Sequence, residues 1–270
     1  MSIAQPFASA ASHQAIVERD RAVAELERAQ RGVTVCITYH NEENELLERA
    51  WWSAAQQAVK PYEIIVVDDG SDKPLAERWS PATETYPTRI VTITNRGLPA
   101  ARNTGLMLAK GVGFLPLDAD DWLDPTYIEK TLELLFDGAD VVLTGLQEHG
   151  PTRNGTYFPG YDRPWHLVTL EDMWQMNRFY YCSLFRTETL RNVGGYNALM
   201  AGAWNRDGGY EDWDLTLVLM TRGARYAAVD EVLFHYTTKP DSMLTRAEAN
   251  RAALVGEMRR HHRLDAHSAQ

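Results

Sequence analysis

The chain has 270 residues, 44% of them hydrophobic, so it can bury a full core as one large domain or as a domain with a subdomain. Its 27 basic and 37 acidic residues give a net charge of −10, which disfavours binding of nucleic acid over the whole surface. No apolar run approaches the ~20 residues that cross a bilayer, and no signal segment opens the chain, so we expect a cytoplasmic protein. Cys36 and Cys182 lack the spacing of a zinc or redox site and are predicted core residues.

Residues 1–31 form the first predicted unit, a short polar tail followed by a helix over 13–31. The helix is charged, with a thin apolar stripe at Ile16, Val23 and Leu26. Such a stripe either docks on the domain, which is the commoner case, or pairs with another chain. Self-association through this helix is therefore one expectation.

Residues 32–144 alternate between strand and helix patterns. Runs of β-branched and apolar residues predict strands at 33–39, 63–67, 90–94, 113–118 and 139–144. Apolar residues at helical spacing predict helices at 44–59, 98–109 and 125–135. This alternation predicts an α/β fold whose crossovers are right-handed.

Residues 145–243 differ in composition and include many aromatic, proline and glycine residues. Asn154-Gly155 predicts a hairpin, and a capping box from Thr169 to Asp172 predicts a helix to about residue 178. Further predicted elements are a strand at 180–186, a helix at 211–221 and two short strands at 226–229 and 232–236. The last unit, residues 244–270, contains a predicted helix from about 246 to 262, opened by a second capping box at Thr245.

Three carboxylates follow the strand at 113–118 directly: Asp118, Asp120 and Asp121. Clustered acids repel one another unless a cation neutralises them, and oxygens spaced i, i+2 can bracket a hard divalent ion such as Mg²⁺. The alternative is a solvated acidic turn before a helix, and this pattern alone leaves both open.

Two other predicted strands also end in polar or acidic residues, Tyr39 to Asn41 after the first and Asp68-Asp69 after the second. In a doubly wound sheet, ligands bind at the carboxyl ends of the strands, where these three tips converge. A single acidic strand end is weak evidence of function, but three together predict a ligand-binding site at that edge.

Five motifs in order strengthen this interpretation: IVVDDGS at 65–71, NRGLPAARN at 95–103, LDADD at 117–121, VGGY at 193–196 and YEDWD at 210–214. Together they resemble glycosyltransferase family 2, over about residues 33–242. The resemblance implies a GT-A fold, a Rossmann-like mixed sheet with helices on both faces, here with an N-terminal helix and a C-terminal helical tail. It also implies that residues 32–144 bind a nucleotide-sugar donor and residues 145–243 bind the acceptor and carry out catalysis.

The resemblance assigns the donor site residue by residue. Asp68, or else Asp69, would hydrogen-bond the nucleobase of a UDP-sugar, because a carboxylate accepts an imide N–H strongly. Tyr39 and Asn41 would line the same pocket. Arg102 would lie near the nucleotide and its diphosphate, unless it is a helix-surface arginine, and Ser242 would contact phosphate.

The metal site follows from the same resemblance. Asp118 and Asp120 correspond to the DXD motif, and His235 is similar in placement to a histidine that serves as a further metal ligand. Imidazole beside two carboxylates makes Mn²⁺ at least as suitable as Mg²⁺. Asp121 would orient the donor sugar or cap the next helix.

Glu211 and Asp212 match the acidic pair of the family that supplies the catalytic base. Asp212 is the predicted base, since the acceptor hydroxyl must lose a proton as its oxygen attacks the anomeric carbon. The alternative is a pair of acids that only stabilise the start of a helix through its dipole. The reaction implied is a single inverting displacement.

The pattern also departs from the family in one respect. QMNRF at 175–179 echoes a motif of processive members but precedes Glu211 and ends in Phe, so we interpret it as a helix face and expect a non-processive enzyme. The alternative function is a non-catalytic sugar-nucleotide-binding module or an assembly subunit of GT-A fold. A nucleotidyltransferase is disfavoured, because no basic Gly-rich loop follows the first strand.

The expected acceptor is a hydroxyl on a glycan, a lipid-linked sugar, a protein or a small molecule, and a lipid-linked acceptor would place the protein peripherally at the inner membrane face. The aromatic residues offered to it are Trp165, Trp174, Tyr180, Trp204 and Tyr210.

Overall fold

The structure is a computed structural model that describes residues 32–81, 86–151, 153–202, 209–240 and 242–268. The predicted helix over residues 13–31, with its expected self-association, and Trp204 lie outside these ranges.

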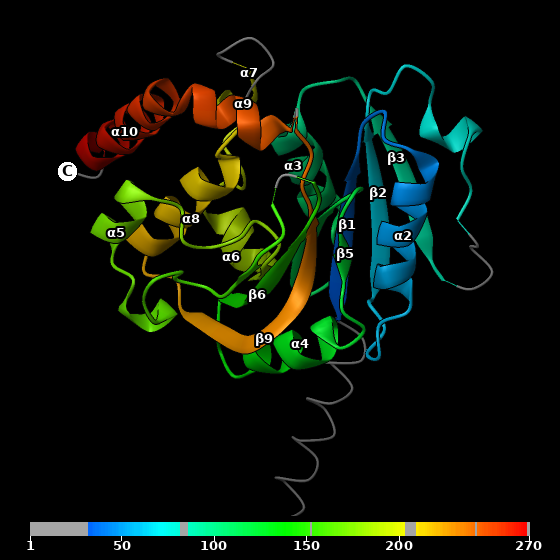
Figure 1. The fold of residues 1–270 in the computed structure, drawn as a ribbon, viewed down its shortest axis with the longest axis horizontal. Helices are drawn as coiled ribbons and strands as arrows, with labels where there is room; N and C mark the ends of the chain where they lie inside the picture. The colour runs from blue at the N-terminus through cyan, green and yellow to red at the C-terminus, as the bar shows by residue number, and fades with distance from the viewer. Residues whose placement is uncertain (1–31, 82–85, 152, 203–208, 241, 269–270) are drawn as a thin grey trace, which may run out of the picture.

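A mixed sheet forms the centre of the described fold (Figure 1), with nine strands and the order β3-β2-β1-β4-β8-β6-β9-β5, while β7 pairs with β6. β1 (Val33–Tyr39), β2 (Glu63–Asp69), β3 (Thr88–Ile93) and β4 (Gly113–Asp118) run parallel. β8 (Leu184–Arg186) is antiparallel to both β4 and β6 (Val141–His149). β9 (Tyr226–Thr237) is parallel to β6, β5 (Trp122–Leu123) is antiparallel to β9, and β7 (Thr156–Tyr157) is antiparallel to β6.

Helices cover both faces of the sheet. One core cluster combines β1 with α2 (Asn44–Ala55) and α4 (Tyr127–Phe136). The other combines β2 with α3 (Leu98–Leu108), α6 (Thr187–Asn192), α8 (Glu211–Thr221) and α10 (Arg251–Ser268). The remaining helices are α5 (Leu170–Gln175), α7 (Leu199–Gly202), α9 (Met243–Ala249) and the 3₁₀ turns at Leu75–Glu77 and Trp165–Leu167.

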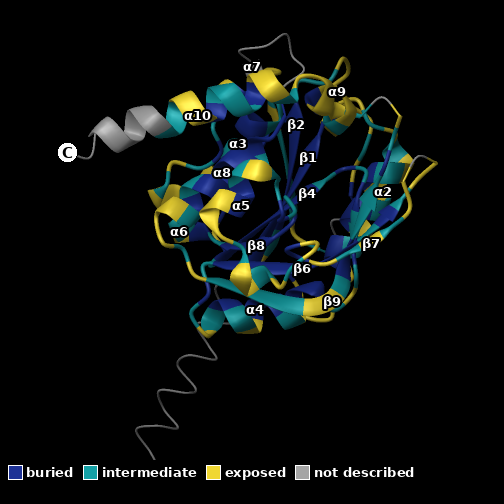
Figure 2. Ribbon diagram, turned by 60° about the vertical axis from the view of Figure 1, so that its left-hand side comes forward, coloured by how far each residue is buried: buried dark blue, intermediate teal, exposed yellow. Residues whose placement is uncertain are grey.

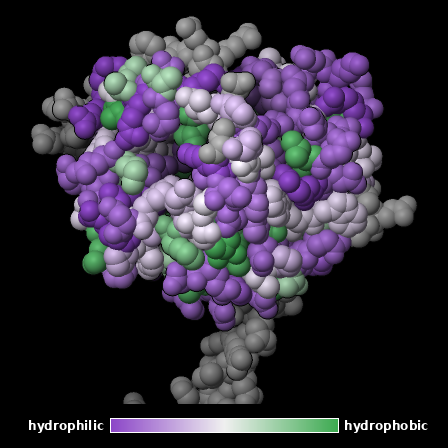
Figure 3. Space-filling model, viewed as in Figure 1, coloured by the Kyte–Doolittle hydropathy of each residue, from purple (hydrophilic) through white to green (hydrophobic). Residues whose placement is uncertain are grey.

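Side chains alternate across the sheet as a period of two requires. Ile37 of β1 packs in the first cluster and Cys36 in the second. Figure 2 shows that buried residues concentrate on the strands and on the inward sides of the helices. The face in Figure 3 is mostly hydrophilic, with hydrophobic residues in small separate patches.

The predicted α/β alternation, the hairpin of β6 with β7 and the buried cysteines are confirmed. No helix within the described ranges combines the length and apolarity needed to cross a bilayer.

Two predictions of how the chain divides into elements were wrong. The strands expected at 226–229 and 232–236 form one strand, β9, because β6 pairs along its whole length and the irregularity is absorbed as register shifts around Gly145. The tail helix is two helices, α9 and α10, and α9 is capped by Ser242 rather than Thr245, since Ser242 Oγ accepts from the Thr245 N–H at 3.2 Å.

Candidate active site

The strand tips meet at one edge of the sheet, as predicted. β1 lies between β2 and β4, so that Tyr39 faces Asp68 and Thr38 faces Asp118. Thr38 Oγ1 donates to Asp118 Oδ1 at 2.8 Å. Parallel pairing therefore brings acids from distant parts of the chain together.

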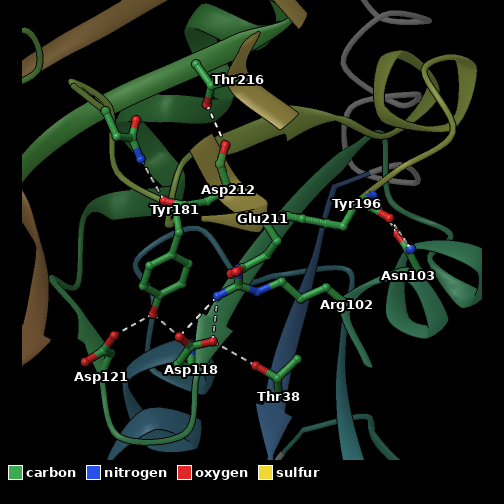
Figure 4. Close-up of polar contacts among 11 residues, drawn as sticks. Thr38, Arg102, Asn103, Asp118, Asp121, Tyr181, Tyr196, Glu211, Asp212 and Thr216 are labelled. Carbon is green, nitrogen blue, oxygen red and sulfur yellow. Dashed lines mark hydrogen bonds and ion pairs between the residues drawn. The ribbon is translucent and has the colours of Figure 1, made fainter. Parts of the chain in front are cut away.

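Arg102 links this edge to the second half of the chain (Figure 4). From α3, its Nη2 donates to both oxygens of Asp118 at 2.9 and 3.1 Å, and its Nη1 donates to Glu211 Oε1 at 2.7 Å. Its guanidinium also lies 4.5 Å from the ring centre of Tyr181. The side chain is 1% exposed. The alternative expectation, an arginine on the helix surface, is wrong, because the side chain is buried and both terminal nitrogens bond carboxylates. The predicted place of Arg102 near the nucleotide and its diphosphate stays a prediction.

Asp121 is also buried, and each of its carboxylate oxygens accepts a hydrogen bond. Tyr181 Oη donates to Asp121 Oδ2 at 2.5 Å, and the Thr237 N–H donates to its other oxygen at 2.7 Å. Burial raises the pKa of Asp121 well above its ordinary value, and the charges of Asp120 and Asp118 add to this. Asp121 thus joins the β4 tip to the end of β9. It does not cap α4, whose N-cap is Thr126, and its predicted role in orienting the donor sugar stays a prediction.

Asp120 faces a lysine that sequence reasoning missed. Lys239 Nζ lies 2.9 Å from Asp120 Oδ2 and 2.8 Å from Glu42 Oε2. Burial and the charge of Asp118 raise the pKa of Asp120, while the bond from Lys239 opposes the shift. Partial burial would lower the pKa of Lys239, but its bonds to both carboxylates raise it. The ammonium group is therefore a counter-cation for the β4 tip.

Asp118 and Asp120, the predicted DXD pair, offer the oxygen ligands that a hard divalent cation takes. The Asp118 and Asp120 side chains are 23% and 21% exposed, so both are accessible, and the acid cluster requires positive charge. Arg102 and Lys239 supply it here. The donor set thus fits Mg²⁺ or Mn²⁺ at these two residues.

His235 does not join Asp118 and Asp120 in a common metal site. Its ring stacks on Trp122 at 5.1 Å, and its Nδ1 lies 3.0 Å from His149 Nε2. Burial and His149 lower its pKa. In the described chain, a single set of three metal-ligating side chains has ligand atoms within 4.8 Å of one another, and it contains none of Asp118, Asp120 and His235. The predicted three-residue metal site is therefore not assembled, because the pairing of β5 with β9 places His235 opposite Trp122.

The acidic pair opens α8 after Tyr210, whose φ of 64° is left-handed, an uncommon conformation for a residue with a side chain. Glu211 is 5% exposed, and its burial raises its pKa to about 7, with Asp212 adding to the shift and Arg102 opposing it. Asp212 is half-buried and accepts a bond from Asn177 Nδ2 at 3.0 Å. Burial raises the pKa of Asp212, against the effect of Arg102.

A cleft of about 500 Å³ joins these groups. Its walls include Asp118 and Arg102 from the first half and Glu211 and Asp212 from α8. Of the five aromatic residues predicted for the acceptor, Tyr180 and Tyr210 line the cleft, whereas Trp165 and Trp174 pack against the second core cluster.

A neighbouring hollow of about 410 Å³ is lined by Lys239 and Ser242 and shares Arg153, Tyr236, Leu244 and Glu248 with the cleft. Ser242 thus lies beside the cleft as a helix cap, and its predicted contact with phosphate stays a prediction.

The residues predicted to bind the nucleobase form hydrogen bonds to the loops that follow β1, β2 and β3. Asp68 is fully buried and accepts from the Ser71 N–H at 3.0 Å, from Ser71 Oγ at 2.6 Å and from the Leu75 N–H at 2.9 Å. Both of its oxygens are therefore bonded by the following loop, and its expected contact with a base stays a prediction. Asp69 is buried too and accepts from the Arg96 N–H at 2.9 Å.

Tyr39 is buried and donates to the Glu42 carbonyl at 2.7 Å. Asn41 is exposed at a φ of 54°, and its Oδ1 accepts from the Asp72 N–H at 3.0 Å. Asn41 is therefore the accessible member of the predicted base pocket.

Sequence reasoning missed Asn177, Tyr181 and Lys239. QMNRF at 175–179 was predicted to be a helix face, but α5 ends at Gln175 and Asn177 reaches Asp212. The similarity of QMNRF to the motif of processive family members was the sequence signal that could have identified Asn177. Lys239 and Tyr181 carried none, because their carboxylate partners lie more than 50 residues away.

Sheet, acidic edge and cleft together define a GT-A type fold. It is similar to Staphylococcus aureus TarS 1–349 in complex with UDP, with a TM-score of 0.60 and 19% identity over 84% of this chain and 65% of that chain. The chain belongs to glycosyl transferase family 2, whose model matches residues 34–207, more than half of the chain.

Curated relatives agree with this family. The chain is 33% identical over 129 residues to glycosyltransferase GlyA of Streptococcus pneumoniae, covering 47% of this chain and 18% of GlyA. It is 36% identical over 120 residues to an undecaprenyl-phosphate 4-deoxy-4-formamido-L-arabinose transferase of Pectobacterium carotovorum, covering 42% of this chain and 36% of that protein. The aligned part is thus about a third or less of each relative's length.

Proposed function

We propose that the chain is an inverting, metal-dependent and non-processive glycosyltransferase that moves a sugar from a nucleotide sugar, a UDP-sugar, to an acceptor hydroxyl. One observation carries the proposal: Arg102 bonds both Asp118 and Glu211, so that the DXD tip and the acidic pair border the same cleft. The relatives named as transferases support the class of activity, and the structure of TarS with UDP supports this class of donor.

Asp212 is the proposed base. It borders the cleft, and Asn177 holds one of its oxygens, so the other can take the proton of an acceptor hydroxyl as that oxygen attacks the sugar. Its raised pKa brings a carboxylate closer to the pH at which a base works well. Glu211 positions this helix start through Arg102 and does not itself accept the proton, because its carboxylate is buried against the guanidinium.

Asp118 and Asp120 would hold Mn²⁺ or Mg²⁺, and the chemistry that such an ion supplies is neutralisation of the departing nucleoside diphosphate. Lys239 adds positive charge of the chain itself beside Asp120. Asn41, with Tyr39, Asp68 and Asp69 bonded to the neighbouring loops, would border the base, and Ser242 the phosphates.

Tyr180 and Tyr210 offer aromatic faces on the acceptor side of the cleft, in the proposed acceptor half at residues 145–243. The proposal places the protein in the cytoplasm, or peripherally at the inner membrane face if the acceptor is lipid-linked. Self-association through the helix predicted for residues 13–31 stays a prediction.

The test is UDP release from a panel of UDP-sugars with Mn²⁺ and no acceptor, a slow side reaction of transferases. We expect release with one or a few sugars, matched by a metal-dependent rise in Tm. Asp120→Ala should abolish metal-dependent UDP binding in calorimetry, and the exposed Asp137→Asn should leave it unchanged. Binding without release by any sugar or acceptor would favour the non-catalytic binding module, and no binding at all would reject the proposal.

A further inference from the structure

A second group of metal-ligating side chains lies between α8 and α10. His262 Nε2 is 3.0 Å from Asp214 Oδ1, and His261 Nδ1 is 3.9 Å from the same oxygen. The ligand atoms of the three residues all lie within 4.8 Å of one another. None of the three lines the cleft, so this group is separate from the proposed active site.

Asp214 is a buried carboxylate without a strong cationic partner among the described residues. Its side chain is 1% exposed, and its ion pairs there are with the two histidines alone. Asn197 Nδ2 donates to its other oxygen at 3.2 Å, and the first turn of α8 adds only a partial positive charge. Since buried charges are paired or coordinate metals, this carboxylate beside two imidazole rings suits a bound cation.

His261 favours the bound cation. Its Nδ1 is buried without a hydrogen-bond partner, although it faces a carboxylate oxygen. Adjacent helical residues point about 100° apart, so two neighbouring histidines do not normally reach one point. Here His261 uses its near nitrogen and His262 its far nitrogen, and this difference lets both approach Asp214.

We propose that Asp214, His261 and His262 form a zinc site. Two imidazole nitrogens and one carboxylate oxygen are ligands typical of Zn²⁺, whereas Mg²⁺ prefers oxygen ligands throughout. The site joins the tail helix to α8 two residues after Asp212. A zinc ion there would hold α10 against α8, the helix that carries Glu211 and Asp212.

The experiment uses the full chain without an affinity tag, stripped of metal and titrated with Zn²⁺ by calorimetry. One Zn²⁺ should bind per chain, and saturation should raise Tm by about 5 °C or more at 100-fold excess over Kd. Co²⁺ in place of Zn²⁺ should give visible absorption bands of a nitrogen and oxygen site.

His261→Ala is the decisive variant, because it removes one ligand and leaves the hydrogen bond between His262 and Asp214 in place. Its metal-free Tm should equal that of the wild type, while its Zn²⁺ affinity should fall by more than the ~10- to 100-fold that loss of an outer-shell partner costs. His166→Ala, at an exposed histidine, is the matched control and should bind as the wild type does.

Asp120→Asn should retain the zinc response, since that residue lies at the β4 tip, paired with Lys239, and is not one of the three proposed zinc ligands. The proposal is overturned if the wild type shows no saturable binding, if His261→Ala binds Zn²⁺ as well as the wild type, or if Asp120→Asn abolishes binding. In those cases the bond from His262 to Asp214 is a structural contact between helices and nothing more.

Discussion

Arg102 and Glu211 form a buried ion pair at 2.7 Å between residues 109 positions apart in the chain. Because Arg102 also bonds Asp118, one guanidinium fixes the distance between the β4 tip and the start of α8. The geometry of the cleft therefore depends on a residue that is itself almost inaccessible to a ligand.

Replacing Arg102 should destabilise the fold. Arg102→Met leaves two buried or half-buried carboxylates without their cation, so we expect the free energy of unfolding to fall by about 3–5 kcal/mol. Urea unfolding measures this. Arg102→Met with Glu211→Gln should recover part of the loss, and strict additivity of the two changes would contradict a direct pair.

Removing the proposed base should affect turnover more than binding. Asp212→Asn keeps the size of the side chain but cannot take a proton, so kcat should fall by ~10²- to 10⁴-fold while the Kd for UDP stays within about 2-fold. Steady-state kinetics and calorimetry give the two values. Near-normal turnover would eliminate Asp212 as the base, with Asp137→Asn as the surface control.

Activity should be lost on the acidic side at a pH above that of an ordinary aspartate. The proposed base must be deprotonated, and burial raises the pKa of Asp212 above 3.8, so kcat/KM should rise as pH increases through this raised value. A pH profile of kcat/KM in which activity persists to pH 3.8 would contradict a catalytic base whose pKa is raised by burial.

Lys239 should compete with a divalent ion for Asp120. Lys239→Gln removes the ammonium group 2.9 Å from that carboxylate, so Mn²⁺ should bind roughly 2- to 5-fold more tightly without nucleotide, a modest gain because the lysine is about one-third exposed. Calorimetry with Mn²⁺ alone tests this. Lys130→Gln breaks a comparable pair with Glu231 outside the cleft and serves as control. Weaker Mn²⁺ binding in Lys239→Gln would mean that the lysine assists the ion.

The contact of α3 with β1 requires glycine at position 105. A Cβ there would lie 2.1 Å from Cys36 Sγ, so Gly105→Ala should cost about 1–3 kcal/mol of stability. Gly256→Ala on α10 meets nothing closer than 3.9 Å and should be neutral or slightly stabilising. If Cys36→Ala does not relieve part of the Gly105→Ala cost, the clash is not its cause.

Much of the fold was predictable because the signals are local. The spacing of apolar residues identified the strands and helices of residues 33–144, and the alternation of the two implied a parallel arrangement with Tyr39, Asp68 and Asp118 at one edge. The motif around Glu211 and Asp212 likewise identified the start of α8.

Only the tertiary structure decided what those side chains contact. Arg102 is buried rather than on a helix surface, Asp68 is used by its own loop, and His235 stacks on Trp122 instead of joining the DXD acids. Periodicity and propensity are properties of neighbouring residues, whereas each of these contacts, except that of Asp68, joins segments more than a dozen residues apart. Partner choice depends on strand order and register, and no local pattern in this chain encodes them.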